Sequence, residues 1–281
     1  MRLARYELEG KVHIGSVEGE SIAHLSTRID RLGNDMIQLI ARWPELRDHA
    51  ERLSGKVDCR VGDVTLLAPV ERPGKLWGIG LNYKDHIEES GGAAPEEQTW
   101  FAMANTTATS PYGDIELPRV SSDLDYEAEL VFVVGARVRY ATAAQAKDAI
   151  FGYCVGNDVS VRDWQFRTGQ FSIGKAFDTH APYGPWIVTA DEIDPLALPI
   201  RSFVNGELRQ QSNTRHLLFG PAQQVEHLSK VMTLEPGDVF FTGTPGGVGA
   251  AMKPPRYLEV GDHVRVEIDG IGHIENTVIQ G

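Results

Sequence analysis

The sequence has few of the features that mark secreted, membrane or thiol-rich proteins. Its two cysteines, Cys59 and Cys154, lie far apart and match no metal-ligand spacing, so neither a disulfide framework nor a thiolate zinc site is expected. No segment approaches the roughly 20 apolar residues that cross a bilayer, and the first residues lack the unbroken apolar run of a secretion signal. We therefore expect a cytoplasmic protein with two free, buried thiols and no membrane partner.

Positive charge is scarce as well. The chain has 27 lysines and arginines against 39 acidic residues, a formal net charge of -12, and no run of basic residues. This balance argues against binding to nucleic acid or to an anionic membrane. An anionic substrate would need a local positive charge, and a bound cation is one way to supply it.

The first part of the chain differs in pattern from the rest. Strand-like alternation in Arg2–Ser16 precedes a helical pattern from Asp35 to Leu53, in which Pro44 is expected to break or kink the helix. A proline-containing linker follows. The pattern predicts a small N-terminal α/β domain, residues 1–70, and a larger domain, residues 71–281.

The larger domain reads as mostly short strands separated by glycine and proline. Helical periodicity is confined to Thr142–Ile150 and Pro221–Met232, each of which precedes a strand. This mixture predicts an α+β, β-rich fold, with a sheet closed on itself and helices at its edges.

The run DLDYEAELVFVVG contains the most informative polar residues. On a strand, Glu127 and Glu129 point to the same face. Taken alone, such a pair is typical of a solvated polar face. However, the continuation VFVVG is apolar at every position, as in a strand buried on both faces, and the next apolar strand carries Asp158. Three carboxylates in a core need protons or a cation between them.

Oxygen-only ligands favour Mg²⁺, Mn²⁺ or Ca²⁺ over zinc. Three monodentate carboxylates on an octahedral ion would leave about three positions open. The two oxygens of a 1,3-dicarbonyl or 2-oxo acid could fill two of these positions, with water in the third.

Several motifs in order resemble the catalytic domain of the fumarylacetoacetate hydrolase family. They are the E-x-E pair followed by GNDVSVRDWQ, KAFDTHAPYGP, FVNGELRQ, LEPGDVFFTGTPGGVG and LEVGDHVRVEIDGIG, and the similarity runs from Lys75 to Gly281. The resemblance implies a mixed β-sandwich roll, a Mg²⁺-type site, a small oxo-acid substrate and a homodimer. It assigns the metal ligands to Glu127, Glu129 and Asp158, the cavity lysine to Lys175, and substrate contacts to Tyr83, Arg162, Gln165 and Thr244.

Each of these assignments has a simpler alternative on local sequence alone. Lys175 could be a surface lysine, and Arg162 could pair with the neighbouring Asp163 rather than hold a substrate carboxylate bidentately. The segment around Thr244 lacks GK[ST], so it is not a phosphate-binding loop. It is either a turn that exposes backbone amides or a plain strand end.

The polar segment Tyr83–Gln98 reads as a short helix followed by a flexible loop, which we interpret as a lid. His86 and Glu89 lie three residues apart on one helical face. Such a pair is usually only solvated, but the family pattern N-Y-x-x-H-x-x-E falls on it. The resemblance therefore implies that Glu89 orients His86 as a base for water, with Glu88 one position out of register.

One departure from the family affects the substrate. Met103 and Ala104 stand where family members often carry Lys-Pro, so a cationic group expected near the cavity is missing. We interpret this as a sign of a less acidic or bulkier substrate. Trp100, Phe101 and Trp164 are candidates for lining its pocket, or else pack in the core.

The favoured reaction is hydrolytic cleavage of a carbon–carbon bond in a β-dicarbonyl or acylpyruvate-type acid. A divalent ion would polarise the carbonyl, with His86 activating water and Lys175 steadying the developing negative charge. Decarboxylation, hydration and isomerisation use the same kind of site and remain alternatives. A non-catalytic metal-binding scaffold is a third possibility.

Overall fold

The computed structural model describes residues 1–91 and 93–281. The N-terminal strands form an antiparallel run in the order β4-β3-β2-β1, with β5 also beside β1. Their bounds are β1 Arg2–Leu8, β2 Lys11–Glu18, β3 Ser21–His24, β4 Cys59–Arg60 and β5 Thr65–Leu67. The strand-like alternation in Arg2–Ser16 therefore belongs to two strands that form a hairpin. Glu9 and Gly10 both have positive φ at its tip, the backbone that a tight two-residue turn requires.

The predicted helix over Asp35–Leu53 is two helices, α1 (Met36–Ala41) and α2 (Trp43–Leu53). Asp35 caps α1 by accepting a hydrogen bond from the Ile37 amide. Pro44 lies in the first turn of α2, where its missing N–H costs no helical hydrogen bond. Pro44 thus marks a new helix start, as the sequence predicted.

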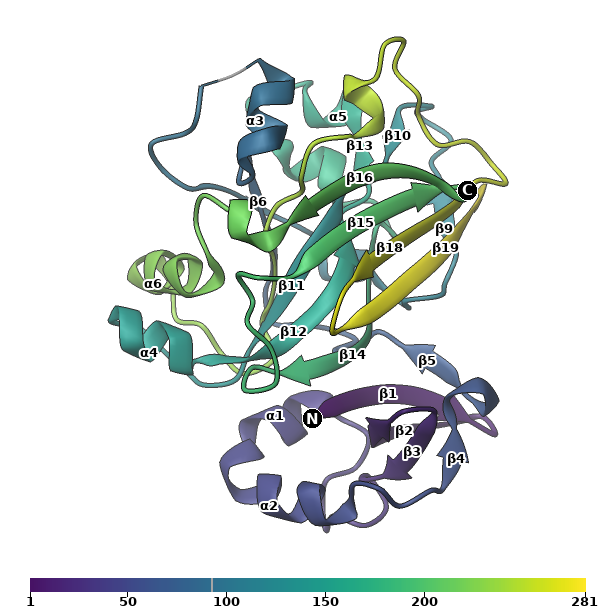
Figure 1. The fold of residues 1–281 in the computed structure, drawn as a ribbon, viewed down its shortest axis with the longest axis vertical. Helices are drawn as coiled ribbons and strands as arrows, with labels where there is room; N and C mark the ends of the chain where they lie inside the picture. The colour runs from purple at the N-terminus through teal and green to yellow at the C-terminus, as the bar shows by residue number, and fades with distance from the viewer. Residues whose placement is uncertain (92) are drawn as a thin grey trace.

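The N-terminal lobe, at the bottom of Figure 1, is joined to the body by a sheet and a shared core. Strand β1 pairs with β14 through Arg2↔Val188 and Leu3↔Ile187. Leu3 also belongs to one hydrophobic cluster with Leu39 of α1 and Phe241 of the body. The two parts therefore share buried surface as well as a linker.

Two sheets make up the body. The described residues extend the first sheet to twelve strands, in the order β4-β3-β2-β1-β14-β12-β11-β17-β6-β7 with β5 and β8 at its sides. Its body strands are β6 Leu76–Gly80, β7 Thr99–Ala102, β8 Ala108–Thr109, β11 Ala128–Val134, β12 Ile150–Asn157, β14 Ala181–Thr189 and β17 Val239–Phe241.

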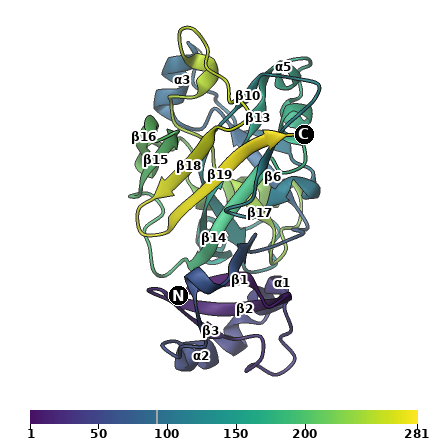
Figure 2. The ribbon, with the colours of Figure 1, turned by 90° about the vertical axis from the view of Figure 1, so that its right-hand side faces the viewer.

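The second sheet has the order β16-β15-β18-β19-β9, and a small ladder joins β10 to β13. The bounds are β9 Ile115–Leu117, β10 Leu124–Asp125, β13 Ser160–Val161, β15 Pro199–Val204, β16 Glu207–Asn213, β18 His263–Ile268 and β19 Gly272–Gln280. Figure 2 shows β18 and β19 lying across β14. Val155 and Phe132 of the first sheet pack with Ile200 and Val266 of the second. The β-rich sandwich roll expected from the sequence is confirmed.

The helices of the body are short and lie at its edges. They are α3 Lys84–Ser90, α4 Ala143–Asp148, α5 Arg162–Gln165 and α6 Pro221–Val231. Single 3-10 turns occur at η1 Val61–Asp63, η2 Asn105–Thr107, η3 Phe171–Lys175, η4 Thr214–His216 and η5 Gly249–Ala251. Both helical patterns predicted in the body are confirmed. Within the described residues, no helix is both long and apolar enough to cross a membrane.

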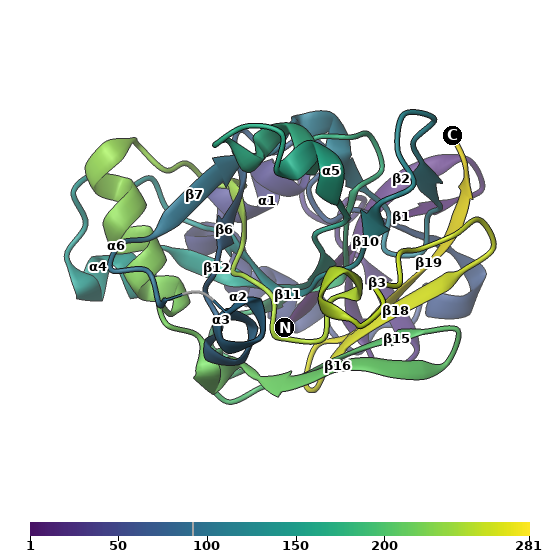
Figure 3. The ribbon, with the colours of Figure 1, turned by 90° about the horizontal axis from the view of Figure 1, so that it is seen from above.

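Strand β11 explains why charged groups come together inside this body. All seven of its residues are buried, because β12 and β17 flank it within the sheet and its alternate side chains pack into separate hydrophobic clusters on the two faces. In the β11–β12 register Glu129 is opposite Gly156, and the Asp158 amide then donates to the Glu127 carbonyl (2.9 Å). Viewed from above, α3 and α5 lie on either side of β11 (Figure 3).

Both cysteines are free. Cys154 is buried in β12 as expected, whereas Cys59 in β4 is only half-buried.

Candidate active site

Three buried carboxylates meet at the end of β11. Glu127, Glu129 and Asp158 each offer an oxygen, and these oxygens all lie within 4.8 Å of one another. Their residues are 5%, 1% and 0% exposed. Alternation along β11 aims the two glutamates the same way, and the β12 register adds the aspartate. The predicted convergence of the three carboxylates is confirmed.

Cations reach two of the three carboxylates directly. Lys175 at the end of η3 places Nζ 2.8 Å from Glu127 Oε2 and 2.8 Å from Asp158 Oδ2. Arg162 Nη1 lies 2.6 Å from Glu127 Oε1. Glu129 instead accepts a hydrogen bond from the Gly243 amide (2.7 Å). Lys175 is therefore a buried network residue, not a surface lysine.

The pKa values of the triad follow from this uneven pairing. Burial works to raise the pKa of Glu127, but Lys175 and Arg162 hold it at about 2. Burial and the neighbouring charges of Asp158 and Glu127 raise the pKa of Glu129 well above its usual value. Burial, only partly offset by Lys175, raises the pKa of Asp158 to about 7. No lysine or arginine among the described residues pairs directly with Glu129, and the single contact with Lys175 does not offset the burial of Asp158.

The site fits a hard divalent cation. Asp158 Oδ1 is buried and has no hydrogen-bond partner among the described residues, which is costly unless an ion or water occupies that position. The converging donors are all carboxylate oxygens, the ligands that Mg²⁺, Mn²⁺ and Ca²⁺ prefer.

A cavity of about 610 Å³ opens above the triad. Among the described residues, eight polar side chains line it: His86, Glu89, Glu127, Arg162, Gln165, Lys175, Thr244 and Lys253. The apolar part of its wall includes Leu81, Phe101, Phe166, Phe171, Val248 and Met252. Six of the predicted catalytic and substrate-contacting residues therefore face one cavity, together with the metal-site residue Glu127.

Tyr83 has a different position. Its side chain is fully buried, its hydroxyl has no hydrogen-bond partner in the described structure, and it is not among the described residues that line the cavity. Burial, followed by the negative charges of Glu129 and Asp85, raises the pKa of Tyr83 well above 10.0. Tyr83 is therefore buried outside the described lining of the cavity, so any contact with substrate would require movement.

Helix α3 carries the predicted base and its partner to the cavity. His86 Nδ1 lies 3.5 Å from Glu89 Oε2, without a formed hydrogen bond among the described residues. Both Glu89 oxygens accept from the Gly247 amide, at 2.9 and 3.0 Å. Burial opposes ionisation of Glu89, but His86 and this amide lower its pKa. Glu88 is exposed and does not line the described part of the cavity.

The helical part of the predicted lid is anchored to the body. Ser212 Oγ donates to Asp85 Oδ2 (2.7 Å), and Tyr83 forms an isolated bridge with Leu217. Gly92, half of the glycine pair in the proposed lid, lies outside the described residues. Closure of Tyr83–Gln98 over a ligand stays a prediction.

Arg162 does not form the salt bridge with Asp163 that the local sequence left open. Its Nε donates to Asp125 Oδ2 (2.9 Å), and its Nη1 also donates to Gln165 Oε1 (2.9 Å). Asp163 instead pairs with Arg167 (3.1 Å). The sequence analysis did not single out Asp125, although it shares the alternation of Glu127 and Glu129 two residues further back.

Of the three aromatic residues predicted either to line the substrate pocket or to pack in the core, one lines the cavity and two pack against other rings. Phe101 lines the cavity, whereas Trp100 packs edge-on against Phe240 and Trp164 against Phe177. Met103 is buried in the core that joins the lobes. Phe166, Phe171 and the exposed Lys253 line the outer wall of the cavity and were not predicted from the sequence.

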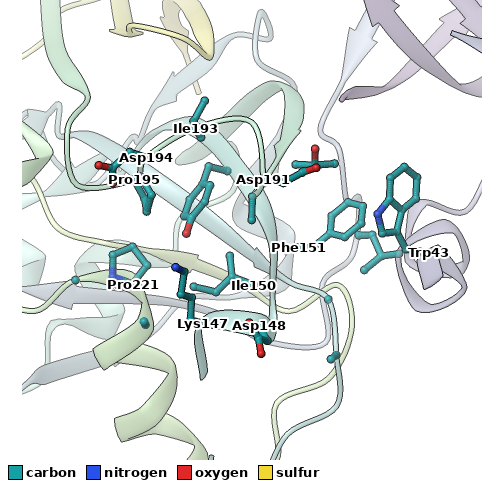
Figure 4. A pocket seen from close by; sticks show the side chains of 18 of the residues that line it. Trp43, Lys147, Asp148, Ile150, Phe151, Asp191, Ile193, Asp194, Pro195 and Pro221 are labelled. Atoms are coloured by element: carbon teal, nitrogen blue, oxygen red, sulfur yellow. The ribbon is translucent and has the colours of Figure 1, made fainter. Parts of the chain in front are cut away.

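A larger cavity, about 1000 Å³, lies between the N-terminal lobe and the body (Figure 4). Trp43 of α2 packs edge-on against Phe151 at its side. Its Asp191 is already paired with Arg47 (2.7 Å). Among the described residues, its acidic side chains form no cluster suited to a metal ion. The smaller cavity is therefore the candidate active site.

Comparison with known proteins gives a consistent result. A family model described as fumarylacetoacetate (FAA) hydrolase C-terminal matches residues 75–279. A mitochondrial oxaloacetate tautomerase of Rattus norvegicus is 38% identical over 287 residues, covering 99% of this chain and 92% of the relative.

Two solved structures cover all of this chain and all of their own. The fumarylacetoacetate hydrolase of Exiguobacterium antarcticum has a TM-score of 0.87 at 36% identity. The maleylpyruvate hydrolase of Sphingobium sp. SYK-6, in complex with manganese(II) and pyruvate, has a TM-score of 0.84 at 32% identity.

The triad geometry predicts the effect of removing one carboxylate charge. Glu129→Gln keeps an oxygen that can accept from the Gly243 amide but removes an anionic ligand. We expect Mn²⁺ affinity in calorimetric titration to fall by roughly tenfold or more, with the fold retained. Glu88→Gln, an exposed change on α3, is the control. Equal affinity in Glu129→Gln and wild type would remove Glu129 from the ligand set.

Proposed function

This chain belongs to the fumarylacetoacetate hydrolase family, and we propose that it is a metal-dependent enzyme that hydrolyses a carbon–carbon bond in a β-dicarbonyl or acylpyruvate-type oxo-acid. One observation carries the proposal. A buried carboxylate triad with too little positive charge opens into the same cavity as a histidine–glutamate pair and a buried lysine. That combination supplies an ion site, a base and an anion-stabilising group together.

The residues Glu127, Glu129 and Asp158 would hold Mg²⁺ or Mn²⁺. The manganese(II) in the Sphingobium maleylpyruvate hydrolase supports this choice of ion. Bound there, a divalent cation would act as a Lewis acid toward the oxygens of an oxo-acid.

Lys175 stays charged in this site and faces the substrate cavity. Burial alone would lower its pKa, but Asp158 and Glu127 outweigh burial and raise it. Its ammonium can therefore donate to a substrate oxygen on which negative charge develops as the carbon–carbon bond breaks. Because salt bridges to Glu127 and Asp158 already fix the nitrogen, little reorganisation is needed.

His86 is the base in this proposal. Its Nδ1 faces Glu89, whose charge is stabilised by the Gly247 amide. The other ring nitrogen is then free to take a proton from a water molecule. Glu89 favours the imidazolium that results and fixes the ring orientation.

The outer wall supports a substrate larger than pyruvate. A volume of about 610 Å³ lies within the usual range for ligand pockets. Phe166, Phe171 and Met252 belong to this wall, and Phe166 is 65% exposed. This wall suits an oxo-acid with a bulky apolar substituent.

Keto–enol tautomerisation of an oxo-acid is the second candidate. The oxaloacetate tautomerase of Rattus norvegicus, 38% identical over nearly the whole chain, supports it. His86 would then move a proton between carbon and oxygen of the substrate, and no activated water is required. The same residues serve both reactions, so the products must distinguish them.

Proton NMR of product mixtures tests the proposal. With Mg²⁺ present, we expect acetylpyruvate and bulkier acylpyruvates to give pyruvate and a second carboxylic acid, with one water consumed per bond broken. Faster keto–enol exchange of oxaloacetate, without cleavage of acylpyruvates, would replace hydrolysis by tautomerisation. Loss of CO₂ would indicate a decarboxylase. No turnover across this panel, with metal bound, would contradict an enzymatic role and favour a scaffold.

His86→Ala separates ion binding from proton transfer. We expect turnover to fall by roughly 10²–10⁴, the usual contribution of a general base, while calorimetric Mn²⁺ affinity stays at the wild-type value. Glu89→Gln should lose less, because an amide can still orient the ring. Glu88→Gln is the matched control on the same helix and should be nearly silent. Unchanged turnover in His86→Ala would exclude this residue as the base.

A further inference from the structure

A fourth buried carboxylate, Asp125, lies beside the triad without belonging to it. Asp125 ends β10 and is 0% exposed. Its oxygens accept four hydrogen bonds from described residues, and it is absent from the group of described carboxylates close enough to share an ion. The donors are the amides of Tyr126 (2.9 Å), Gly249 (2.8 Å) and Ala250 (3.0 Å), and Nε of Arg162 (2.9 Å).

Arg162 connects Asp125 to the triad. The guanidinium of Arg162 donates a hydrogen bond from Nε to Asp125 and another from Nη1 to Glu127 (2.6 Å). In this buried network, four carboxylates face the two cations Arg162 and Lys175. When every group is ionised, two negative charges are left uncompensated, which is the charge that one divalent ion neutralises. Asp125 therefore cancels a positive charge that would otherwise repel the ion.

The same carboxylate also holds one wall of the cavity. The amides of Gly249 and Ala250 begin η5, and Ala250 and Met252 line the cavity. The Arg256 amide closes this loop onto the Gly249 carbonyl (3.0 Å). A Cβ on Gly249 would lie 2.7 Å from Asp125 Oδ1 and 2.2 Å from the Arg256 carbonyl, so only glycine allows so close an approach.

We propose that Asp125 is a positioning residue, which sets the charge balance at the metal centre through Arg162 and fixes the cavity wall through Gly249 and Ala250. The charge part rests on the proposed function, because it requires a divalent ion at the triad. The wall part depends only on the fold. A residue that contacts neither ion nor substrate thus links the two halves of the site.

Asp125→Asn tests the charge part, because the amide keeps the size of the side chain and an accepting oxygen but removes the charge. We expect calorimetric Mn²⁺ affinity to fall about tenfold or more. The matched control is Asp238→Asn, since Asp238 is also 0% exposed and is paired with Lys75 (2.8 Å). This control removes the charge of a buried carboxylate directly before β17 and should leave Mn²⁺ affinity unchanged.

The double variant Asp125→Asn/Arg162→Gln distinguishes charge balance from general damage. It removes one negative and one positive charge, so the imbalance returns to that of wild type. We expect its Mn²⁺ affinity to recover to within about threefold of wild type. A further loss beyond that of Asp125→Asn would overturn the charge part, as would wild-type affinity in Asp125→Asn. If Asp125→Asn fails to fold, the double variant alone decides, and a tenfold loss in it would overturn the proposal.

Amide exchange of metal-free protein tests the wall part separately. Peptides over residues 246–256 should exchange at least about threefold faster in Asp125→Asn than in wild type or Asp238→Asn, because two amides lose a charged acceptor. Equal protection in all three proteins would overturn the wall part. If wild type binds no Mn²⁺, the proposed function and the charge part fail together, while this exchange result still decides whether Asp125 holds the wall.

Discussion

Uncompensated negative charge inside the β-rich core is the constraint on which the site depends. Glu127, Glu129 and Asp158 are almost completely buried, and the positive charge that reaches them comes from Lys175 and Arg162. Burying carboxylates without full compensation is costly. The neighbouring backbone and side chains therefore provide hydrogen bonds, such as the Gly243 amide to Glu129, and a divalent ion would complete the balance.

The fold keeps these charges in place because the strands that carry them are buried on both faces. Strand β11 lies between β12 and β17 in the sheet, and hydrophobic clusters cover both of its faces, so the glutamates cannot turn to solvent. The cavity above them is made from elements distant in sequence. Helix α3 brings His86, α5 brings Arg162, and the loop at Gly249 brings the opposite wall. Chemical groups from three parts of the chain therefore share one enclosed space.

Sequence reasoning succeeded where a local period or a motif determines position. Alternation aimed Glu127 and Glu129 together, and the apolar strand after them indicated burial. It failed where packing between residues distant in sequence determines the position of a side chain. Nothing local showed that Phe166 would line the cavity, that Tyr83 would be buried outside its described lining, or that Asp125 would bind a loop more than a hundred residues away. The strand-like alternation over residues 2–16 gave strands without showing where they divide, because the short turn at Glu9 and Gly10 carries little hydrophobic signal.

The central claim is that the triad of Glu127, Glu129 and Asp158 holds one divalent cation as the centre of catalysis. Anomalous diffraction from crystals of the protein soaked in Mn²⁺ tests this most directly. The account predicts one strong anomalous peak bonded to oxygens of all three carboxylates, at about 2.0–2.2 Å, the distance typical of small hard divalent ions with oxygen ligands. A fully occupied Mn²⁺ elsewhere, with no peak at the triad, would contradict it.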